Sequence, residues 1–294
     1  MMKTFRGTYT VMITPFTPEG ALDLPALRRF VDWQIEQGIH GLIPLGSTGE
    51  FLSLSDEEQE AVAETVIRQA AGRVPVLIGT GAEDTREAVR LSRRAERLGA
   101  DGVMIIPPFY STPTEDELFH HYSTIAGAIG LPIMLYNNPA TANVDLTPPV
   151  VARLSRIDNC RYIKESTLEV TRIRDILRLC GDRMTVFGGI LGFESFVEGA
   201  EGWVAVASNL APGPLARLFT LVADEERIRE ARELYLRYLP LISFVGGHYY
   251  VAGTKALLGH MGLPVGAPRP PRLPLPAPRD AEAREIVASL RLAI

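Results

Sequence analysis

The 294-residue chain has the composition of an ordinary soluble globular protein, with 46% hydrophobic and 22% charged residues. Its formal net charge of −5, without a basic cluster, gives no reason to expect nucleic acid or an anionic membrane as a partner. A small molecule is therefore the expected partner. The first residues lack the pattern of a signal peptide, and no apolar run approaches the roughly 18 residues of a membrane span, so we expect a cytoplasmic location.

Short apolar runs rich in β-branched residues recur along the chain and predict eight strands. The runs cover residues 8–13, 41–45, 75–80, 102–107, 132–137, 160–164, 185–189 and 202–208. Between them lie segments with apolar residues at three- and four-residue spacing, which predicts helices, for example over 24–38, 55–72 and 85–99. Strand and helix alternation with short joints predicts parallel strands. Eight of them can close into an α/β fold of the (β/α)8 TIM barrel type.

The joints between predicted elements carry matching end signals. Three predicted helices end at a glycine with the next strand three residues later, namely at Gly38, Gly99 and Gly199. Ser55 with Glu58, and Thr114 with Glu117, have the spacing of capping boxes at helix starts. An open doubly wound sheet is the competing architecture, but the first predicted strand is not followed by the G-x-G-x-x-G loop of a dinucleotide fold.

Helical patterns continue beyond the eighth predicted strand, over residues 211–244 and 248–262. A proline-rich link over 263–280 and a final helical stretch follow. We therefore predict a catalytic barrel over residues 1–224 and a C-terminal helical extension over 225–294.

Cysteine and histidine usage gives no sign of a disulfide framework or a metal site. Cys160 and Cys180 are expected to be reduced core residues. The five histidines lack ligand spacing with acidic partners, so neither a metal nor another cofactor is expected: they are His40, His120, His121, His248 and His260.

Lysine is almost absent from the chain, and this draws attention to Lys164. The 30 basic residues include only Lys3, Lys164 and Lys255 as lysines, so most basic positions are arginine. Arginine stays charged, whereas a desolvated lysine amine can lose its proton and attack a carbonyl carbon. Lys164 ends the sixth predicted strand, where barrel enzymes place reacting groups. Lys164 could be a nucleophilic amine, or it could form an ion pair with Glu165 or another carboxylate.

Two further candidates occupy the carboxyl ends of predicted strands. Tyr136 ends the fifth strand, next to the sixth, so its phenol and the Lys164 amine should project from adjacent strand ends and could relay protons. It could also be a lid over the core. The loop at Gly46–Gly49 offers the hydroxyls of Ser47 and Thr48 as a neutral cradle for a carboxylate, or is merely a tight turn.

Together these segments resemble the dihydrodipicolinate synthase and N-acetylneuraminate lyase superfamily of Schiff-base lyases. The motifs that carry the likeness are "GSTGE" (46–50), "YNNP" (136–139) and "IKES" (163–166), in the order, spacing and strand placement typical of that superfamily. The likeness spans essentially the whole chain.

The resemblance implies a role for each matching position. Lys164 would form an imine with a 2-keto acid, Tyr136 would shuttle the proton, and Ser47 with Thr48 would hold the substrate carboxylate. Tyr110 matches a tyrosine that reaches into the neighbouring subunit's site and completes a hydroxyl relay, which implies a homodimer, usually paired into a homotetramer. The remaining expected substrate contacts are Gly46, Gly49, Asn138, Thr141, Gly189 and Val206.

Two departures from the superfamily pattern affect the expected reaction. Thr141 stands where dihydrodipicolinate synthases carry an arginine for the second substrate, so lysine biosynthesis is doubtful. The apolar pair Ile190 and Leu191 replaces acids that hold sugar hydroxyls in many relatives, and Glu194 falls deep in the next helix.

These departures favour a substrate with few hydroxyls, or one held by the amides of Asn138 and Asn143. We expect a pyruvate-type aldolase, or a dehydratase or deaminase of 2-keto-3-deoxy acids. The alternatives are 4-hydroxy-tetrahydrodipicolinate synthase, a keto-acid sensor without turnover, and a structural barrel that forms no imine.

Overall fold

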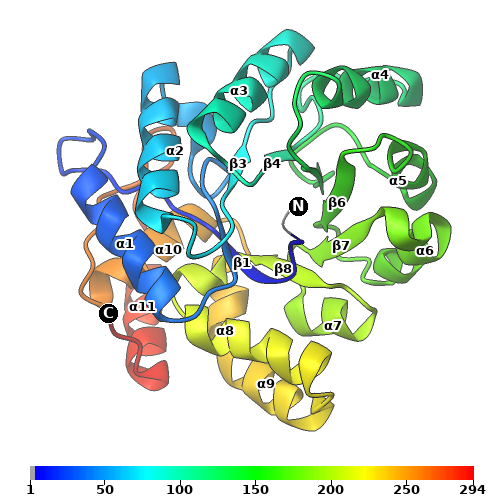
Figure 1. Cartoon of the computed structure of the whole chain (residues 1–294). Helices are drawn as coiled ribbons and strands as arrows, with labels where there is room; N and C mark the ends of the chain where they lie inside the picture. Colours follow the sequence, from blue (N-terminus) through cyan, green and yellow to red (C-terminus); the bar gives the residue numbers. More distant parts are fainter. Residues whose placement is uncertain (1–3) are drawn as a thin grey trace. The chain divides into compact units, whose positions relative to one another are not determined.

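The structure is a computed structural model that describes residues 4–294. Within these residues, strands and helices alternate from the first strand to the eighth helix (Figure 1). The strands are β1 (Gly7–Val11), β2 (Gly41–Ile43), β3 (Leu77–Gly79), β4 (Gly102–Ile105), β5 (Ile133–Asn137), β6 (Cys160–Glu165), β7 (Thr185–Gly188) and β8 (Gly202–Ala205). The helices that follow them are α1 (Leu24–Glu36), α2 (Asp56–Ala70), α3 (Thr85–Leu98), α4 (Glu115–Ala126), α5 (Pro148–Leu154), α6 (Thr171–Cys180), α7 (Gly192–Val197) and α8 (Pro212–Phe219).

The strands pair in parallel. β1 pairs with β2, and each strand from β3 to β7 pairs with the next one along the chain. The order in the eight-stranded sheet is β2-β1-β8-β7-β6-β5-β4-β3. Chain order is thus kept through the sheet, whereas a doubly wound fold reverses it at a switch point. The prediction of a (β/α)8 barrel is confirmed, and the doubly wound alternative is wrong.

The chain divides into two compact units. One contains residues 4–7 with Pro75–Val204 and includes β3 to β7. Within it, α4, α5 and α6 follow one another outside the strands, and each packs against its neighbour (Figure 1). The other unit contains Thr8–Val74 with Ala205–Ile294, and so carries α1, α2 and the C-terminal helices.

A helical extension follows the eighth helix, as predicted. A π-helical turn at Thr220–Asp224 leads to α9 (Ile228–Val245), α10 (Tyr250–His260) and α11 (Ala277–Leu290), which pack against one another. The proline-rich link runs between α10 and α11. The placement of a domain boundary after residue 224 stays a prediction.

The predicted helix ends are confirmed. Ser55 with Glu58 caps α2, and Thr114 with Glu117 caps α4, each as a complete capping box. The three glycines at the helix-to-strand joints have left-handed φ angles of 86°, 91° and 100° at Gly38, Gly99 and Gly199. A side chain there would strain the turn, which explains why glycine ends these helices.

The core explains the sequence pattern of the strands. β4, β5 and β8 are buried along their whole length, so their apolar runs are continuous rather than alternating. Cys160 and Cys180 are free and buried, and burial raises the pKa of the Cys160 thiol to about 12. No helix in residues 4–294 combines the length and apolarity that a membrane crossing requires.

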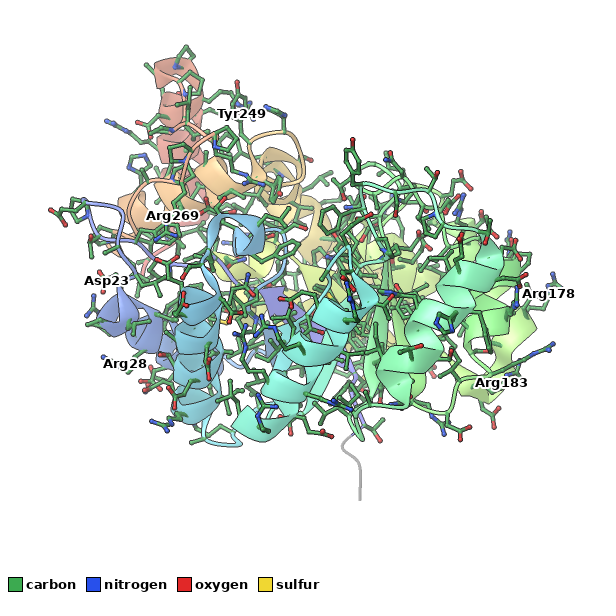
Figure 2. The ribbon with its side chains drawn as sticks, turned by 90° about the horizontal axis from the view of Figure 1, so that it is seen from above. Asp23, Arg28, Arg178, Arg183, Tyr249 and Arg269 are labelled. Atoms are coloured by element: carbon green, nitrogen blue, oxygen red, sulfur yellow. The ribbon has the colours of Figure 1, made fainter. Side chains whose placement is uncertain are left out.

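Within residues 4–294, arginine rather than lysine supplies the charged basic side chains on the surface, as the composition suggests. Arg28, Arg178 and Arg183 are exposed and lie on the outside of the molecule (Figure 2). Lys3 lies outside the described residues, while Lys164 and Lys255 are 5% and 3% exposed. Both described lysines are thus internal, which is unusual for this residue type.

Candidate active site

Lys164 and Tyr136 are direct partners in the sheet. β5 and β6 pair in parallel, and the register places Tyr136 opposite Lys164 near the carboxyl ends of both strands. Side chains that are opposite each other on neighbouring strands project to the same face. The Lys164 amine lies 3.8 Å from the centroid of the Tyr136 ring. The prediction that these two groups meet is therefore confirmed.

The Lys164 amine has no carboxylate beside it in the described part of the chain. Glu165, which follows it on β6, accepts hydrogen bonds from the Asn137 side chain at 3.0 Å and from the Thr167 backbone N–H at 2.9 Å. Its carboxyl group is thus occupied elsewhere. The reading of Lys164 as the partner of Glu165 in an ion pair is wrong, and an amine over an aromatic face remains.

The phenol of Tyr136 is oriented by its own loop. The Asn138 side-chain amide donates to Tyr136 Oη at 3.0 Å, so the oxygen serves as an acceptor. Tyr136 is 6% exposed. A buried phenol whose oxygen already accepts one hydrogen bond has its proton directed by that bond, which suits a proton relay.

A polar network stiffens the strand ends around Lys164. Asn137 is fully buried, and its amide group donates to Asp145 and Glu165 while its oxygen accepts from the Leu146 N–H. Arg172 binds both oxygens of Asp145, at 2.6 and 3.0 Å, and this hydrogen bonding lowers the pKa of Asp145. Burial raises the pKa of Glu165, although its hydrogen bonds act in the opposite direction. The network fixes the segment that follows β5.

The loop after β2 belongs to the other compact unit and forms a tight double turn. The N–H of Gly49 donates to the Gly46 carbonyl at 3.0 Å, and the N–H of Glu50 donates to the Ser47 carbonyl at 3.2 Å. Within residues 4–294, the hydroxyls and backbone N–H groups of Ser47 and Thr48 make no hydrogen bond. Thr48 is only 2% exposed, and buried polar groups normally have a hydrogen-bond partner, so unpaired groups here suit a ligand oxygen.

Tyr110 lies in a segment that is held from two directions. Glu83 accepts hydrogen bonds from the backbone N–H groups of Phe109, Tyr110 and Ser111 at 2.9, 3.0 and 2.9 Å. The Asn143 amide donates to the Tyr110 carbonyl at 2.7 Å. The Tyr110 side chain itself is 84% exposed. The backbone is therefore fixed while the phenol extends from the surface.

The family model described as the dihydrodipicolinate synthetase family matches residues 4–290. The chain belongs to the dihydrodipicolinate synthetase family. This membership indicates an enzyme of the class I aldolase and lyase type.

Individual members of the dihydrodipicolinate synthetase family are similar to this chain over most of its length. A 4-hydroxy-tetrahydrodipicolinate synthase from Syntrophobacter fumaroxidans is 39% identical over 87% of this chain and 88% of its own. A dihydrodipicolinate synthase from Acinetobacter baumannii, solved with pyruvate, has a TM-score of 0.95 and 32% identity, covering 98% of this chain and 100% of its own. YagE, a prophage protein of Escherichia coli K12 also solved with pyruvate, has a TM-score of 0.93 and 32% identity over 99% and 100%.

Other positions that the family resemblance implicates differ in what they contact. Thr141 is exposed, and its N–H and hydroxyl donate to the Asn138 carbonyl at 3.0 and 3.4 Å, so it completes a turn. Val206 is half-buried, and its carbonyl accepts from the Asn209 amide at 2.8 Å. Substrate contact by either residue stays a prediction.

Gly189 follows β7 and has a steric reason to be glycine. A Cβ atom there would lie 1.8 Å from Ser166 Oγ and 2.9 Å from the Glu165 carbonyl. The Ser166 and Thr167 hydroxyls are buried without a hydrogen-bond partner in the described residues. Gly189 therefore leaves space for the segment that follows Lys164, which carries these two hydroxyls without a hydrogen-bond partner in the described residues.

Two charged groups that hold segments with predicted site residues were missed from the sequence. Glu83 holds the Tyr110 segment, and Lys255 forms an ion pair with Glu50 of the "GSTGE" motif at 2.7 Å. The only early signal was the scarcity of lysine, which applies to Lys255 as much as to Lys164. No group of three or more His, Cys, Asp or Glu residues in the described range is arranged to hold a metal ion.

Proposed function

We propose that the protein is a Schiff-base-forming lyase that acts on a 2-keto acid of the pyruvate type. The observation that carries the proposal is the buried Lys164 amine, which lies over the Tyr136 ring and has no carboxylate beside it within the described residues. An amine in that setting is available as a nucleophile. The pyruvate complexes of two family members support the choice of substrate class.

The chemistry would begin at the Lys164 amine. Its nitrogen attacks the C2 carbonyl carbon of the keto acid to give a carbinolamine, which loses water and becomes a protonated imine. The imine nitrogen withdraws electrons better than the ketone oxygen, so the bond from C3 to a hydrogen or to the cleaved carbon can break with its electron pair left on C3, and that pair delocalises as an enamine. Tyr136 relays the proton, with its oxygen oriented by Asn138.

The substrate carboxylate would bind in the loop at Gly46–Gly49. Ser47 and Thr48 offer hydroxyls and backbone N–H groups that make no hydrogen bond within residues 4–294. Several neutral donors on one short loop suit a carboxylate.

The leaving group is constrained by three uncharged positions. Thr141 brings no positive charge, and the pair Ile190 and Leu191 after β7 brings no hydroxyl-binding acid. We therefore favour cleavage, dehydration or deamination of a 2-keto acid with few hydroxyls over condensation with a second anion.

A second candidate, 4-hydroxy-tetrahydrodipicolinate synthase, is favoured by the relatives that carry this name at 36–39% identity. The synthase reaction requires a group other than Thr141 to bind the carboxylate of the second substrate. Arg172 is already bound to Asp145 and Glu169, so it offers no free guanidinium.

The catalytic unit is proposed to be a dimer. Tyr110 is exposed on a rigid segment, as a side chain that completes a neighbouring subunit's site must be. Pairs of such dimers would form the tetramer.

Borohydride trapping tests the proposal. Incubation with pyruvate and borohydride should add the mass of a reduced pyruvyl group at Lys164, and Lys164→Ala should abolish the addition. Peptide mass spectrometry locates the adduct. The lyase proposal is contradicted if the wild-type chain gains no mass with any member of a panel of 2-keto acids.

Product analysis then separates the two candidates. The favoured lyase acts on a single 2-keto acid. It releases pyruvate by cleavage, or it releases the dehydrated or deaminated form of that 2-keto acid. The synthase consumes pyruvate only when aspartate semialdehyde is added. Chromatography of both reactions with the same enzyme preparation decides between them.

A further inference from the structure

Glu50, the last residue of the "GSTGE" motif, is held by the C-terminal region of the same compact unit. Its side chain is 0% exposed, and Lys255 of α10 places its amine 2.7 Å from Glu50 Oε1 with 2% of its side chain exposed. The backbone N–H of Arg269, in the link before α11, donates to Glu50 Oε2 at 2.8 Å. Both carboxylate oxygens of Glu50 therefore meet groups more than 200 positions later in the chain.

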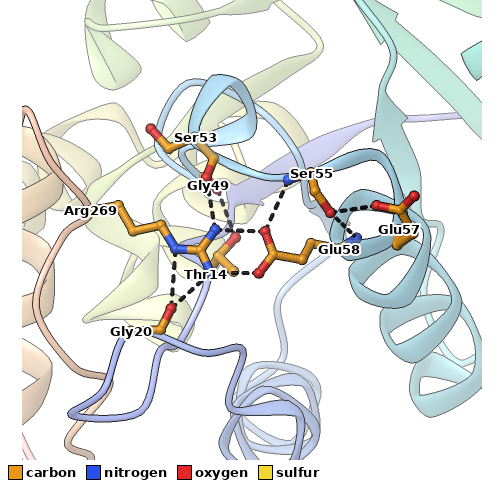
Figure 3. Close-up of polar contacts among 8 residues, drawn as sticks. All are labelled: Thr14, Gly20, Gly49, Ser53, Ser55, Glu57, Glu58 and Arg269. Atoms are coloured by element: carbon orange, nitrogen blue, oxygen red, sulfur yellow. Dashed lines mark hydrogen bonds and ion pairs between the residues drawn. The ribbon is translucent and has the colours of Figure 1, made fainter.

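The loop that Glu50 terminates has a conformation that must be enforced. Leu45 and Glu50 flank the Gly46–Gly49 turn, and both have left-handed φ angles, 60° and 58°, which cost free energy for residues with a side chain. Thr14 adds a restraint by donating to the Gly49 carbonyl at 2.7 Å (Figure 3). A strained turn persists only where its surroundings determine it, and the Glu50 contacts are such surroundings.

Arg269 extends the restraint to the neighbouring segments. Its guanidinium donates to both Glu58 oxygens at 2.5 and 2.6 Å, to the Ser53 carbonyl at 2.8 Å and to the Gly20 carbonyl at 2.8 Å (Figure 3). The turn after Glu50, the start of α2 and the loop before α1 are thus joined at one side chain. The Arg269 guanidinium and the Lys255 amine also lie 4.3 and 4.0 Å from the Phe16 ring centroid.

The Lys255 and Glu50 pair is costly to bury. Desolvation lowers the pKa of Lys255 to about 8, against the opposing attraction of Glu50 and with help from the positive charges of Arg269 and Arg272. Burial thus outweighs the attraction of the partner. Apolar side chains of similar size can often replace such a pair without loss of stability, so a role in fixing a particular conformation explains the pair better than stability does.

We propose that Lys255 and Arg269 are positioning residues for the carboxylate cradle, because they hold Glu50 and thereby the conformation of Ser47 and Thr48. The proposal rests on the proposed function, in which this loop binds the substrate carboxylate. It assigns a task to the C-terminal helical extension: α10 and the link after it complete the loop that receives the keto acid.

The pyruvate concentration that gives half-maximal borohydride trapping at Lys164 measures how tightly the cradle binds the substrate. In Lys255→Met this concentration should rise at least tenfold, while the yield of adduct at saturating pyruvate stays close to that of the wild type. A loss of binding with retained chemistry is the signature of a positioning role. Urea denaturation of the same variant reports its stability.

The double variant Glu50→Gln/Lys255→Met separates positioning from stability. It removes the unpaired buried charge that the single variant leaves, so its free energy of unfolding should return towards the wild-type value. The half-saturating pyruvate concentration should stay raised, because the cradle still lacks its anchor. The double variant also provides the measurement if Lys255→Met fails to fold.

His260→Gln is the matched control. His260 lies on α10 like Lys255, but its ring nitrogen contacts Asp280 of α11 at 2.8 Å and not the loop. This variant should leave half-saturation unchanged. The proposal is overturned if the double variant recovers wild-type half-saturation together with its stability, or if neither Lys255 variant changes it. A wild-type chain that forms no adduct refutes the proposed function itself, and the cradle with it.

Discussion

Lys164 and Lys255 are two buried lysines with similar immediate surroundings and different partners. The Lys164 amine lies 3.8 Å from the Tyr136 ring centroid, and the Lys255 amine lies 4.0 Å from that of Phe16. Lys255 has the Glu50 carboxylate at 2.7 Å. Lys164 has no carboxylate beside it within residues 4–294.

The difference shows that burial and an aromatic contact do not by themselves identify a nucleophilic amine. An opposite charge within hydrogen-bonding distance favours the protonated form of an amine and occupies it. Lys255 is occupied in this way and serves the structure of a loop. Lys164 faces a phenol in place of a carboxylate, and a phenol can accept and return a proton.

The matched pair Lys164→Met and Lys255→Met tests the comparison most directly. Lys164→Met should lower turnover of the keto acid by roughly 10⁴-fold or more, because no other nucleophile replaces the amine. Lys255→Met should still form the borohydride adduct at saturating pyruvate. The intact mass after borohydride reduction shows whether each variant forms the adduct. Equal loss of the adduct in the two variants would contradict the different roles of the two lysines.

Loss of the lysine in the ion pair should lower stability more than a matched change on the same helix does. Lys255→Met leaves the buried Glu50 carboxylate without its partner, so the free energy of unfolding should fall by about 3–5 kcal/mol. His260→Gln on the same helix breaks a partly exposed contact and should cost about 1 kcal/mol or less. Urea denaturation followed by circular dichroism compares them. Similar losses in both variants would show that Glu50 is not buried as described.

The phenol opposite Lys164 can be tested without removing the ring. Tyr136→Phe keeps the aromatic face but removes the proton relay, so exchange of the pyruvate C3 hydrogens with deuterated water should slow about 10²-fold. Nuclear magnetic resonance of pyruvate follows the exchange. A keto-acid sensor without turnover would be unaffected.

Tyr122→Phe is the control for the loss of a buried phenol. Tyr122 donates its hydroxyl to the Ile105 carbonyl at 3.2 Å within the same compact unit. This variant should lose about 1 kcal/mol of stability with unchanged exchange. A similar slowing in both tyrosine variants would contradict a relay at Tyr136.

Glu83 extends the comparison to a charge held by backbone groups near the surface. Burial acts to raise its pKa, but hydrogen bonds from Ser111 and from the N–H groups of Tyr110 and Phe109 outweigh it, and the pKa falls below the ordinary 4.5. A lowered carboxyl pKa means that Glu83 stabilises the fold above pH 4.5 and that this contribution is lost as the pH falls through the folded-state value. Glu83→Gln should remove this part of the acid sensitivity.

The expected size of the Glu83 effect is below about 1 kcal/mol, because solvent screens an exposed carboxylate. Urea denaturation at about pH 6 and about pH 3.5 measures it for wild type and variant. An unchanged pH dependence in Glu83→Gln would show that these hydrogen bonds do not form in solution.

Local signals explain why the fold could be predicted from the sequence. The capping boxes at Ser55 and Thr114 and the joint glycines act within a few residues, and strand burial on both faces produces continuous apolar runs. The meeting of Tyr136 and Lys164 was equally accessible, because consecutive strands of a parallel barrel are neighbours.

Long-range pairing explains what the sequence could not show. Lys255 and Glu50 lie on different elements, and neither helical periodicity nor a turn motif indicates that they meet. Glu83 likewise acts on backbone groups more than 25 residues away. Side-chain contacts of this kind leave no periodic pattern, and only the folded structure reveals them.

The burial of both native cysteines makes the chain convenient for chemical labelling. Alkylating reagents and fluorophores react with the thiolate, and the Cys160 thiol, with its pKa of about 12, supplies almost none at neutral pH. Cys180 is also buried. A cysteine introduced at an exposed position such as Leu52 or Leu273 would therefore accept a single probe selectively, without prior removal of the native thiols.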